Sequence, residues 1–394
     1  MDKLFKKVLL LALPYVLYLS IPVWLLVGTK ELGGNINQII DNASKGNPQL
    51  VGFGFNESCY RYMKLKILAA LPRRDVVALG SSRVLQFRDK MFAPNRFYNA
   101  GYTIKSIPEF MTFVSLLPED KLPRTLIIGL DHWMFNARYD HLNAAPNKQE
   151  WLKYDDMDVT SVFKASKKVY KRTFSGVVSL DDVLFPDKAM ARSQKDAALA
   201  SVPKFGFNAC VNKTGFRNDG SMYYGIQIEK LMANASDAND FKFKDTLHKV
   251  AKGQDRFKQG GEINEEAVRQ LRLFLAYCQK KNIHVVAFLP PFTDTVWNKM
   301  VASGKFHYLD GLNARLQHEL DGYGYEFYDF STFSSAGATD LEAIDGFHGG
   351  ESVYLGMLIR MLDRGSKLNE FCNVNKLRED AARKFNRYTV YQSF

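Results

Sequence analysis

The chain has 394 residues, of which 46% are hydrophobic and 24% charged, enough for a large packed core and unlike the composition of a disordered protein. Its formal net charge is +11, but the lysines and arginines are dispersed and do not form the runs or modules typical of nucleic-acid binding. The composition therefore argues against a nucleic-acid partner and favours a surface that faces anionic lipid headgroups or an anionic envelope polymer.

The first predicted element is a membrane-spanning helix. The twenty residues Val8–Val27 carry no charge, and a helix of this length, at ~1.5 Å per residue, crosses the hydrocarbon core. Three lysines precede it, so the positive-inside rule predicts a cytoplasmic N-terminus and export of everything after Gly28. A cleaved signal peptide is the competing interpretation, although no A-x-A pattern precedes Gly28. The sequence favours a single-pass anchor over residues 1–30 in the cytoplasmic (inner) membrane, in contact with its lipid, and an extracytoplasmic or periplasmic domain.

The next part of the chain predicts an α/β core. Residues 31–56 suit a juxtamembrane spacer, and a helix is predicted over Glu57–Leu71. Helical patterns also cover Pro108–Leu117 and Asn264–Lys281, the latter with Asn264 as N-cap. Short apolar runs between the helical patterns predict five buried parallel strands: Asp75–Leu79, Arg96–Asn99, Thr125–Leu130, His284–Leu289 and Tyr325–Tyr328. Alternating strands and helices predict a doubly wound sheet.

The alternation fails between residues 137 and 261. This stretch is polar and basic, and only Ser221–Ile228 has a strand pattern. It is therefore predicted as an insertion, forming a cap, within a catalytic domain over residues 57–365, followed by a charged tail over 366–394. The four cysteines allow disulfides in an exported protein or serve as buried thiols, and the sequence leaves both open.

The first candidate for chemistry is Gly80-Ser81-Ser82, directly after the first strand. A hydroxyl at this junction lies at the carboxyl end of the sheet, where open α/β sheets bind ligands. The helix N-terminus beyond it offers backbone N–H groups to a developing oxyanion. Taken alone, either serine is better explained as a helix N-cap.

The second candidate is the pair Asp345 and His348, just before a helix predicted over Gly350–Leu362. A serine becomes a good nucleophile only when a base removes its proton, and the base needs an orienting carboxylate. One loop supplies both groups here. A lone D-x-x-H is often only a polar loop, but together with the serine motif it predicts a triad of Ser82, His348 and Asp345.

These two motifs resemble the first and last blocks of the SGNH hydrolases, a G-D-S-type serine and a D-x-x-H, with Ser81 in the place of the family's Asp. With the membrane anchor, the G-S-S form resembles the DltD-type and AlgJ/AlgX-type extracytoplasmic O-acyltransferase proteins. The resemblance implies a three-layer α/β sandwich with a five-stranded parallel sheet (SGNH/flavodoxin-like). It also implies transfer of an acetyl or similar acyl group to a cell-envelope polysaccharide or polymer through an acyl-serine, with a membrane-bound O-acyltransferase as partner.

The middle blocks of that family supply oxyanion donors, and here the match is partial. Asn99-Ala100-Gly101 resembles the start of one block, but Ile104 replaces the second expected glycine. Asp131 stands where an Asn is expected, and an ionised carboxylate cannot donate a hydrogen bond. The candidates for the oxyanion and substrate side are therefore Gly101, Asn99, Asp131, Asn136 and Arg83.

Other features fit simpler explanations. His132 reads as a structural histidine, and Arg217 lies in a turn from which it could reach an anionic substrate. No metal-ligand or nucleotide motif is present, so neither a metal nor a cofactor is predicted. Two alternatives to acyl transfer remain: a carbohydrate esterase or deacetylase, in which water replaces the acceptor, and a non-catalytic adaptor that only binds polymer.

Overall fold

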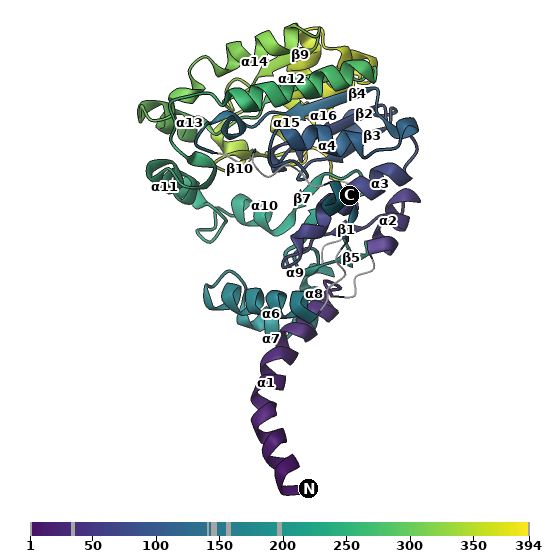
Figure 1. The fold of residues 1–394 in the computed structure, drawn as a ribbon, viewed down its shortest axis with the longest axis vertical. Coiled ribbons are helices and arrows are strands. Elements are labelled where there is room, and N and C mark those ends of the chain that lie inside the picture. The colour runs from purple at the N-terminus through teal and green to yellow at the C-terminus, as the bar shows by residue number, and fades with distance from the viewer. Residues whose placement is uncertain are drawn as a thin grey trace.

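The computed structural model describes residues 2–32, 36–139, 142, 148–154, 159–194 and 199–392 (Figure 1). Its centre is a five-stranded sheet in the order β3-β2-β4-β8-β9, in which every neighbouring pair is parallel. Each strand coincides with a predicted one apart from a residue at either end, which confirms the predicted α/β fold class. The strands are β2 (Val76–Leu79), β3 (Phe97–Ala100), β4 (Thr125–Gly129), β8 (His284–Leu289) and β9 (Glu326–Asp329).

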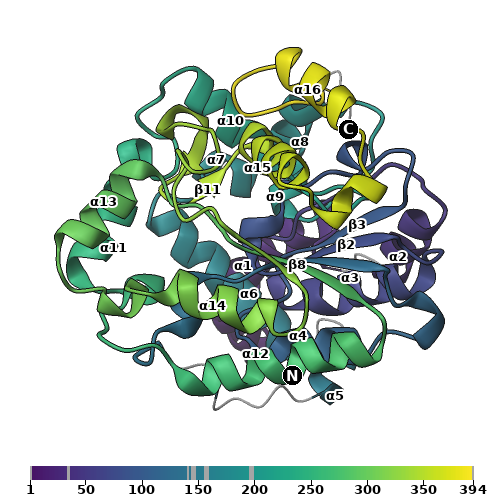
Figure 2. The ribbon, with the colours of Figure 1, turned by 90° about the horizontal axis from the view of Figure 1, so that it is seen from above.

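Helices cover both faces of this sheet, because alternate side chains of each strand point to opposite sides. Val77, Leu126 and Val285 belong to one core with α3 (Tyr60–Ala70), α4 (Pro108–Ser115), α12 (Glu265–Lys280) and α14 (Leu312–Asp321). Val76 and Ile127 belong to a second core with α15 (Glu351–Asp363) and α16 (Val374–Ala382). Figure 2 shows α12 and α4 on one side of the strands and α15 on the other. The core is thus a three-layer arrangement.

The segment predicted as a spacer is part of the folded body. It contains α2 (Ile36–Ser44), which buries Ile36 and Ile39, and β1 (Leu50–Val51). Strand β1 lies in a second sheet of order β5-β1-β6-β7, paired parallel with β5 and antiparallel with β6. The other strands of this sheet are β5 (Lys204–Phe205), β6 (Thr214–Phe216) and β7 (Met222–Tyr224). Residues 36–56 are therefore held by strands from the inserted region, which sequence patterns do not reveal.

The inserted region is mainly helical, and its two ends meet in a β-bridge between Asn136 and Ile263. Of the predicted strand Ser221–Ile228, only the three residues of β7 are extended, and a helix begins at Gly225. Its helices are α5 (Lys148–Leu152), α6 (Val159–Phe174), α7 (Leu180–Leu184), α8 (Pro186–Gln194), α9 (Phe207–Asn212), α10 (Gly225–Met232) and α11 (Lys244–Lys252).

The C-terminal tail is also folded. Leu368, Leu377 and Val390 are buried in the same core as α15. All four cysteines are free thiols, and three of them, Cys59, Cys210 and Cys278, are buried. The remaining elements, α13 (Asp294–Ala302), β10 (Ala343–Asp345) and β11 (His348–Gly349), lie after β8 and before α15.

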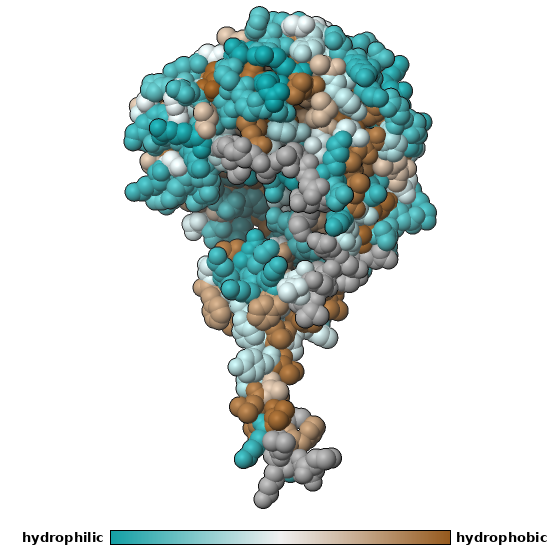
Figure 3. Space-filling model, viewed as in Figure 1, coloured by the Kyte–Doolittle hydropathy of each residue, from teal (hydrophilic) through white to brown (hydrophobic). Residues whose placement is uncertain are grey.

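Helix α1 (Asp2–Gly28) extends away from the body (Figure 1). Among the described residues it is the one helix long and apolar enough to cross a membrane, over Phe5–Gly28. Large apolar side chains such as Leu10 and Leu11 are mostly exposed along it, and Figure 3 shows hydrophobic residues on this stalk. This exposure suits a helix that faces lipid.

Candidate active site

Ser82 is positioned by the tight junction after β2. The hydroxyl of Ser81 accepts a hydrogen bond from the backbone N–H of Arg83 at 3.2 Å, so Ser81 is the cap of a short 3-10 helix, Ser82–Val84. A Cβ on Gly80 would lie 2.9 Å from Val84, which explains why a glycine stands there. Since Ser81 caps the helix, the hydroxyl of Ser82 is left for another contact.

That contact is with His348. The Oγ of Ser82 lies 2.8 Å from Nε2 of His348, and Nδ1 of His348 lies 2.8 Å from Oδ2 of Asp345. Asp345 ends β10 and His348 begins β11, and these two strands pair antiparallel just before α15. The other carboxylate oxygen of Asp345 accepts the backbone N–H groups of Phe347 and His348. The predicted hydrogen-bonded arrangement of the three side chains is confirmed.

Asp345 is suited to orient the imidazole. Burial raises the pKa of this carboxyl, but the neighbouring His348 and the two backbone N–H groups outweigh it and hold the pKa below its ordinary value. The carboxylate is therefore ionised at neutral pH and accepts the Nδ1 proton of His348. Nε2 is then left to accept a proton from Ser82.

Ser82 opens into a cavity of about 660 Å3, a size typical of small-ligand sites. The cavity is polar and aromatic, and two of its lining residues, Trp151 and Arg256, come from the inserted region. No sequence pattern singled out either residue, because both lie in the stretch without regular periodicity. The other lining residues are Glu57, Tyr60, Arg61, Tyr62, Ser81, Ser82, Tyr102, Ile104 and Lys105.

Two expected oxyanion donors are hydrogen-bonded elsewhere. The N–H of Gly101 donates to Oδ1 of Asn99 at 2.9 Å, and the amide of Asn99 donates to the carbonyls of Val84 and Phe87. The N–H of Ile104 donates to the carbonyl of Gly80. The expectation that Gly101 and Asn99 face an oxyanion is therefore wrong for this structure, because these donors hold the loop after β3 and join it to the segment after β2.

Arg83 and Asp131 form a buried pair and do not line the cavity. Nη1 of Arg83 lies 3.4 Å from Oδ1 of Asp131, and both side chains are fully buried. Arg83 also donates to the carbonyl of Pro290 and lies over the ring of Phe292. Burial raises the pKa of Asp131, and the charge of Arg83 opposes this. The pair is a structural support near the triad.

Asn136 and Arg217, also considered from sequence, have structural partners too. The amide of Asn136 donates to the carbonyl of Lys258 at 2.6 Å, across the base of the insertion. Arg217 is buried, with Nη2 3.1 Å from Glu351. His132 is buried and its Nε2 lies 2.8 Å from the hydroxyl of Ser331, as expected for a structural histidine.

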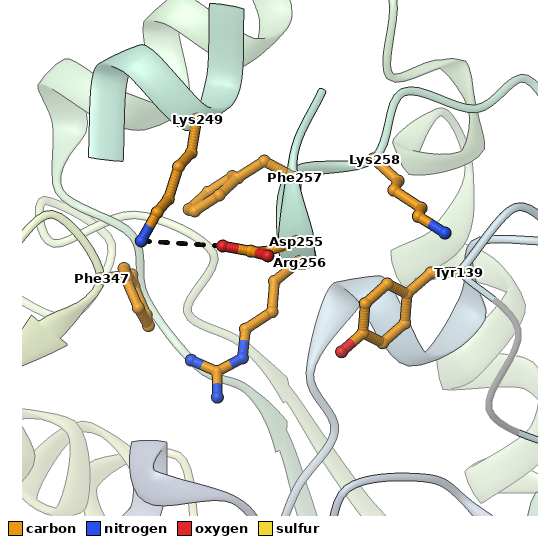
Figure 4. A pocket seen from close by; sticks show the side chains of 7 residues that line it. All are labelled: Tyr139, Lys249, Asp255, Arg256, Phe257, Lys258 and Phe347. Atoms are coloured by element: carbon orange, nitrogen blue, oxygen red, sulfur yellow. Dashed lines mark ion pairs between the residues drawn. The ribbon is translucent and has the colours of Figure 1, made fainter. Parts of the chain in front are cut away.

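A second cavity of about 530 Å3 adjoins the first (Figure 4). Arg256 borders both cavities, and Phe347, next to His348 in the chain, borders the second. Its lining contains Lys249, Arg256 and Lys258 but one carboxylate, Asp255, which is paired with Lys249 at 3.7 Å. The excess of cations makes this cavity suited to an anionic group.

A buried ion-pair network joins the loop after β2 to the helix after His348. Arg88 lies 2.6 Å from Glu351, at the start of α15, and 3.1 Å from Asp219. Burial raises the pKa of Asp219, but Arg88 and Arg217 outweigh it and lower that pKa. These pairs fix α15 relative to the segment that carries Ser82.

The chain was compared with protein-family models and with curated proteins, and neither comparison found a match. Among the described residues, there is no cluster of three or more His, Cys, Asp or Glu side chains that could hold a metal ion.

Proposed function

We propose that this protein is a membrane-anchored extracytoplasmic O-acyltransferase that acylates a cell-envelope polysaccharide or polymer through an acyl-serine on Ser82. The observation that carries the proposal is the unbroken hydrogen-bonded chain from Ser82 through His348 to Asp345. The Oγ–Nε2 and Nδ1–Oδ2 distances along it are both 2.8 Å. Such a chain beside a cavity is the arrangement that activates a serine for acyl transfer.

The reaction would take place in two steps. Nε2 of His348 takes the proton of Ser82 while Oγ attacks the carbonyl carbon of the acyl donor, and the proton passes to the leaving group. A hydroxyl of the acceptor then attacks the acyl-serine, with His348 again as the base, and the new ester leaves as Ser82 regains its proton. The charge that develops on the carbonyl oxygen would be stabilised by the N–H of Ser82 and by Arg256, which lines the same cavity.

The walls of the cavities support a carbohydrate acceptor with negative charge. Tyr62 and Tyr102 are partly exposed and provide aromatic surfaces on which a sugar ring can lie. Trp151 is buried and supports the wall through its contact with Arg61. Lys249, Arg256 and Lys258 supply positive charge in the adjoining cavity. The acyl donor would come from a membrane-bound O-acyltransferase partner, as the family resemblance implies, and the anchor α1 would keep the enzyme near it.

The proposal is tested by the ester content of the envelope polymer in cells that carry Ser82→Ala. The ester content should fall if the protein is a transferase, because no side chain remains to hold the acyl group. It should rise if the protein is an esterase. Ser81→Ala is the matched control and should change little. An unchanged ester content, with Ser82→Ala folded and present at normal levels, would exclude both enzymatic functions and leave a polymer-binding adaptor.

A further inference from the structure

A small group of helices packs beside the C-terminal end of α1. Residues 159–185, which include α6 and α7 and are called the helical platform below, share a buried apolar cluster with Leu25 and Leu26. The ring of Tyr170 stacks on that of Tyr18, with 4.4 Å between centroids. The hydroxyl of Tyr170 also donates to the backbone carbonyl of Tyr18. The platform therefore contacts α1 from Tyr18 to Leu26, and Figure 1 shows it where the stalk meets the body.

The platform exposes large apolar side chains. Phe174 is 86% exposed, Val177 68% and Leu180 60%. They recur every three residues from the end of α6 through the connection to the start of α7, so they are close neighbours in the chain and not scattered single residues. Phe163, Leu184 and Phe185 of the platform are also exposed. Contiguous apolar exposure of this kind marks a surface that contacts lipid or protein.

The length of α1 fixes the depth of this surface in a membrane. From Val8 to Tyr18 the helix rises only ~15 Å, half of a hydrocarbon core that is ~30 Å thick. If α1 spans the bilayer, its residues beyond Tyr18 must lie in the outer half of the core. The platform contacts α1 over those same residues, so its apolar surface lies at the depth of the outer leaflet.

The charges of α6 are complementary to lipid headgroups. Lys164, Lys167 and Lys171 are exposed and recur at helical spacing beside Phe163 and Phe174. Lysines flanking an apolar face are typical of helices that lie in the membrane interface, where they are attracted to anionic lipid. Lys168 and Arg172 point to the body, since they donate to the carbonyls of Phe55 and Gly54.

We propose that the helical platform is an interfacial membrane-binding element. Phe174, Val177 and Leu180 insert among the acyl chains of the outer leaflet, and the lysines of α6 contact anionic phospholipid headgroups. The inference rests on the proposed membrane topology of α1 and not on the chemistry of the triad. The extracytoplasmic domain is then attached at two places, which fixes the orientation of the active site above the membrane. A single flexible tether would leave that orientation free.

The test is a depth measurement on the full-length protein in vesicles of phosphatidylethanolamine and phosphatidylglycerol. A fluorescent label is placed on single cysteines introduced as Val177→Cys, Leu11→Cys and Val301→Cys, each with Cys372→Ser because Cys372 is only half buried. Leu11 reports on the anchor, and Val301, 58% exposed on α13, is the matched control outside the platform. Spin-labelled lipid quenches labels inside the bilayer, and iodide quenches labels in water.

The label at Val177 should lose most of its fluorescence to spin-labelled lipid and resist iodide, whereas the label at Val301 should do the reverse. A label at Val177 that iodide quenches and lipid does not would overturn the proposal and leave the surface to a membrane-protein partner. Failure of lipid to quench at Leu11 would overturn it too, by removing the anchor. Acylation of Ser82 in the same vesicles is measured separately, so a failed anchor and a failed enzyme are distinguished.

Discussion

Ser82, His348 and Asp345 form a continuous hydrogen-bonded chain on one side of the site, whereas the backbone donors on the other side are already bonded to other groups of the protein. On the first side, the side chains are aligned for proton transfer. On the second, Gly101 and Ile104 donate to Asn99 and Gly80. In the proposed mechanism the oxyanion would therefore be bound by the N–H of Ser82 and by Arg256 from the insertion. The general base is thus held more firmly than the groups that would stabilise the oxyanion. Mutations in the triad should therefore reduce activity more than mutations on the oxyanion side.

The largest effect should come from Ser82→Ala and His348→Ala. Each should reduce acyl transfer by on the order of 10⁶-fold, and the double variant should lose no more than either single one, because the members of a triad act as a unit. The measurement is turnover of an activated ester. Ser81→Ala should retain most activity. Additive losses in the double variant would contradict a shared proton-transfer chain.

Asp345→Asn should come next, with a loss of about 10⁴-fold, because an amide stabilises the wrong tautomer of the histidine. The lowered pKa of Asp345 means that the wild-type carboxylate stays ionised well into the acidic range. In Asp345→Asn, turnover should fall while binding of the donor is unchanged, and steady-state kinetics separates the two effects. A variant that keeps wild-type turnover would show that Asp345 does not orient His348.

The buried network that joins the segment of Ser82 to the helix after His348 should have a large effect on stability. Glu351→Gln removes the partner of Arg88 and Arg217 in a buried network, and breaking a buried pair in this way costs about 3–5 kcal/mol. Urea unfolding measures the change. Glu265→Gln, which removes an exposed pair with Arg315 at 2.7 Å, is the control and should change the free energy of unfolding little. Equal losses in the two variants would mean that the buried network does not hold α15.

The smallest effect should come from the oxyanion side, through Arg256. Arg256→Ala should reduce kcat/KM by about 10- to 100-fold, since a hydrogen bond to a charged group contributes about 1.5–3 kcal/mol. The loss should be larger for an anionic acceptor than for a neutral one, and the difference should shrink with added salt. Arg269→Ala, on the exposed face of α12, is the control. An unchanged kcat/KM would leave the N–H of Ser82 as the main oxyanion donor.

The sheet and the triad could be predicted from the sequence because their signals are local. Runs such as Val76–Leu79 are apolar throughout because both faces of the strand are buried. The N-cap Asn264 accepts the N–H groups of Glu266 and Ala267 as expected. The triad needs two motifs, and parallel strands bring the loops that follow them to one edge of the sheet. Topology places Ser82 at this edge, and the β10–β11 pair after β9 brings Asp345 and His348 to it.

The second sheet and the walls of the cavities could not be predicted, because their signals are not local in the sequence. Strand β1 has two residues, too few for any periodicity, and its pairing of Leu50 with Lys204 joins segments far apart in the chain. Arg256 lies in a polar stretch where any of several basic residues fits equally well. The acceptors of the Gly101 and Asn99 hydrogen bonds could not be predicted either, because the hydrogen bonds of a loop depend on its backbone conformation. Residue types alone do not specify that conformation.

The most direct measurement is the mass of the protein after reaction with an activated acetyl ester, followed by peptide mapping. An acyl-serine mechanism predicts the addition of one acetyl group to the peptide that contains Ser82 in the wild type. The adduct should be absent in Ser82→Ala and should not accumulate in His348→Ala. Acetylation that persists in Ser82→Ala at the wild-type rate, or that maps only to a lysine such as Lys105, would contradict the proposed nucleophile.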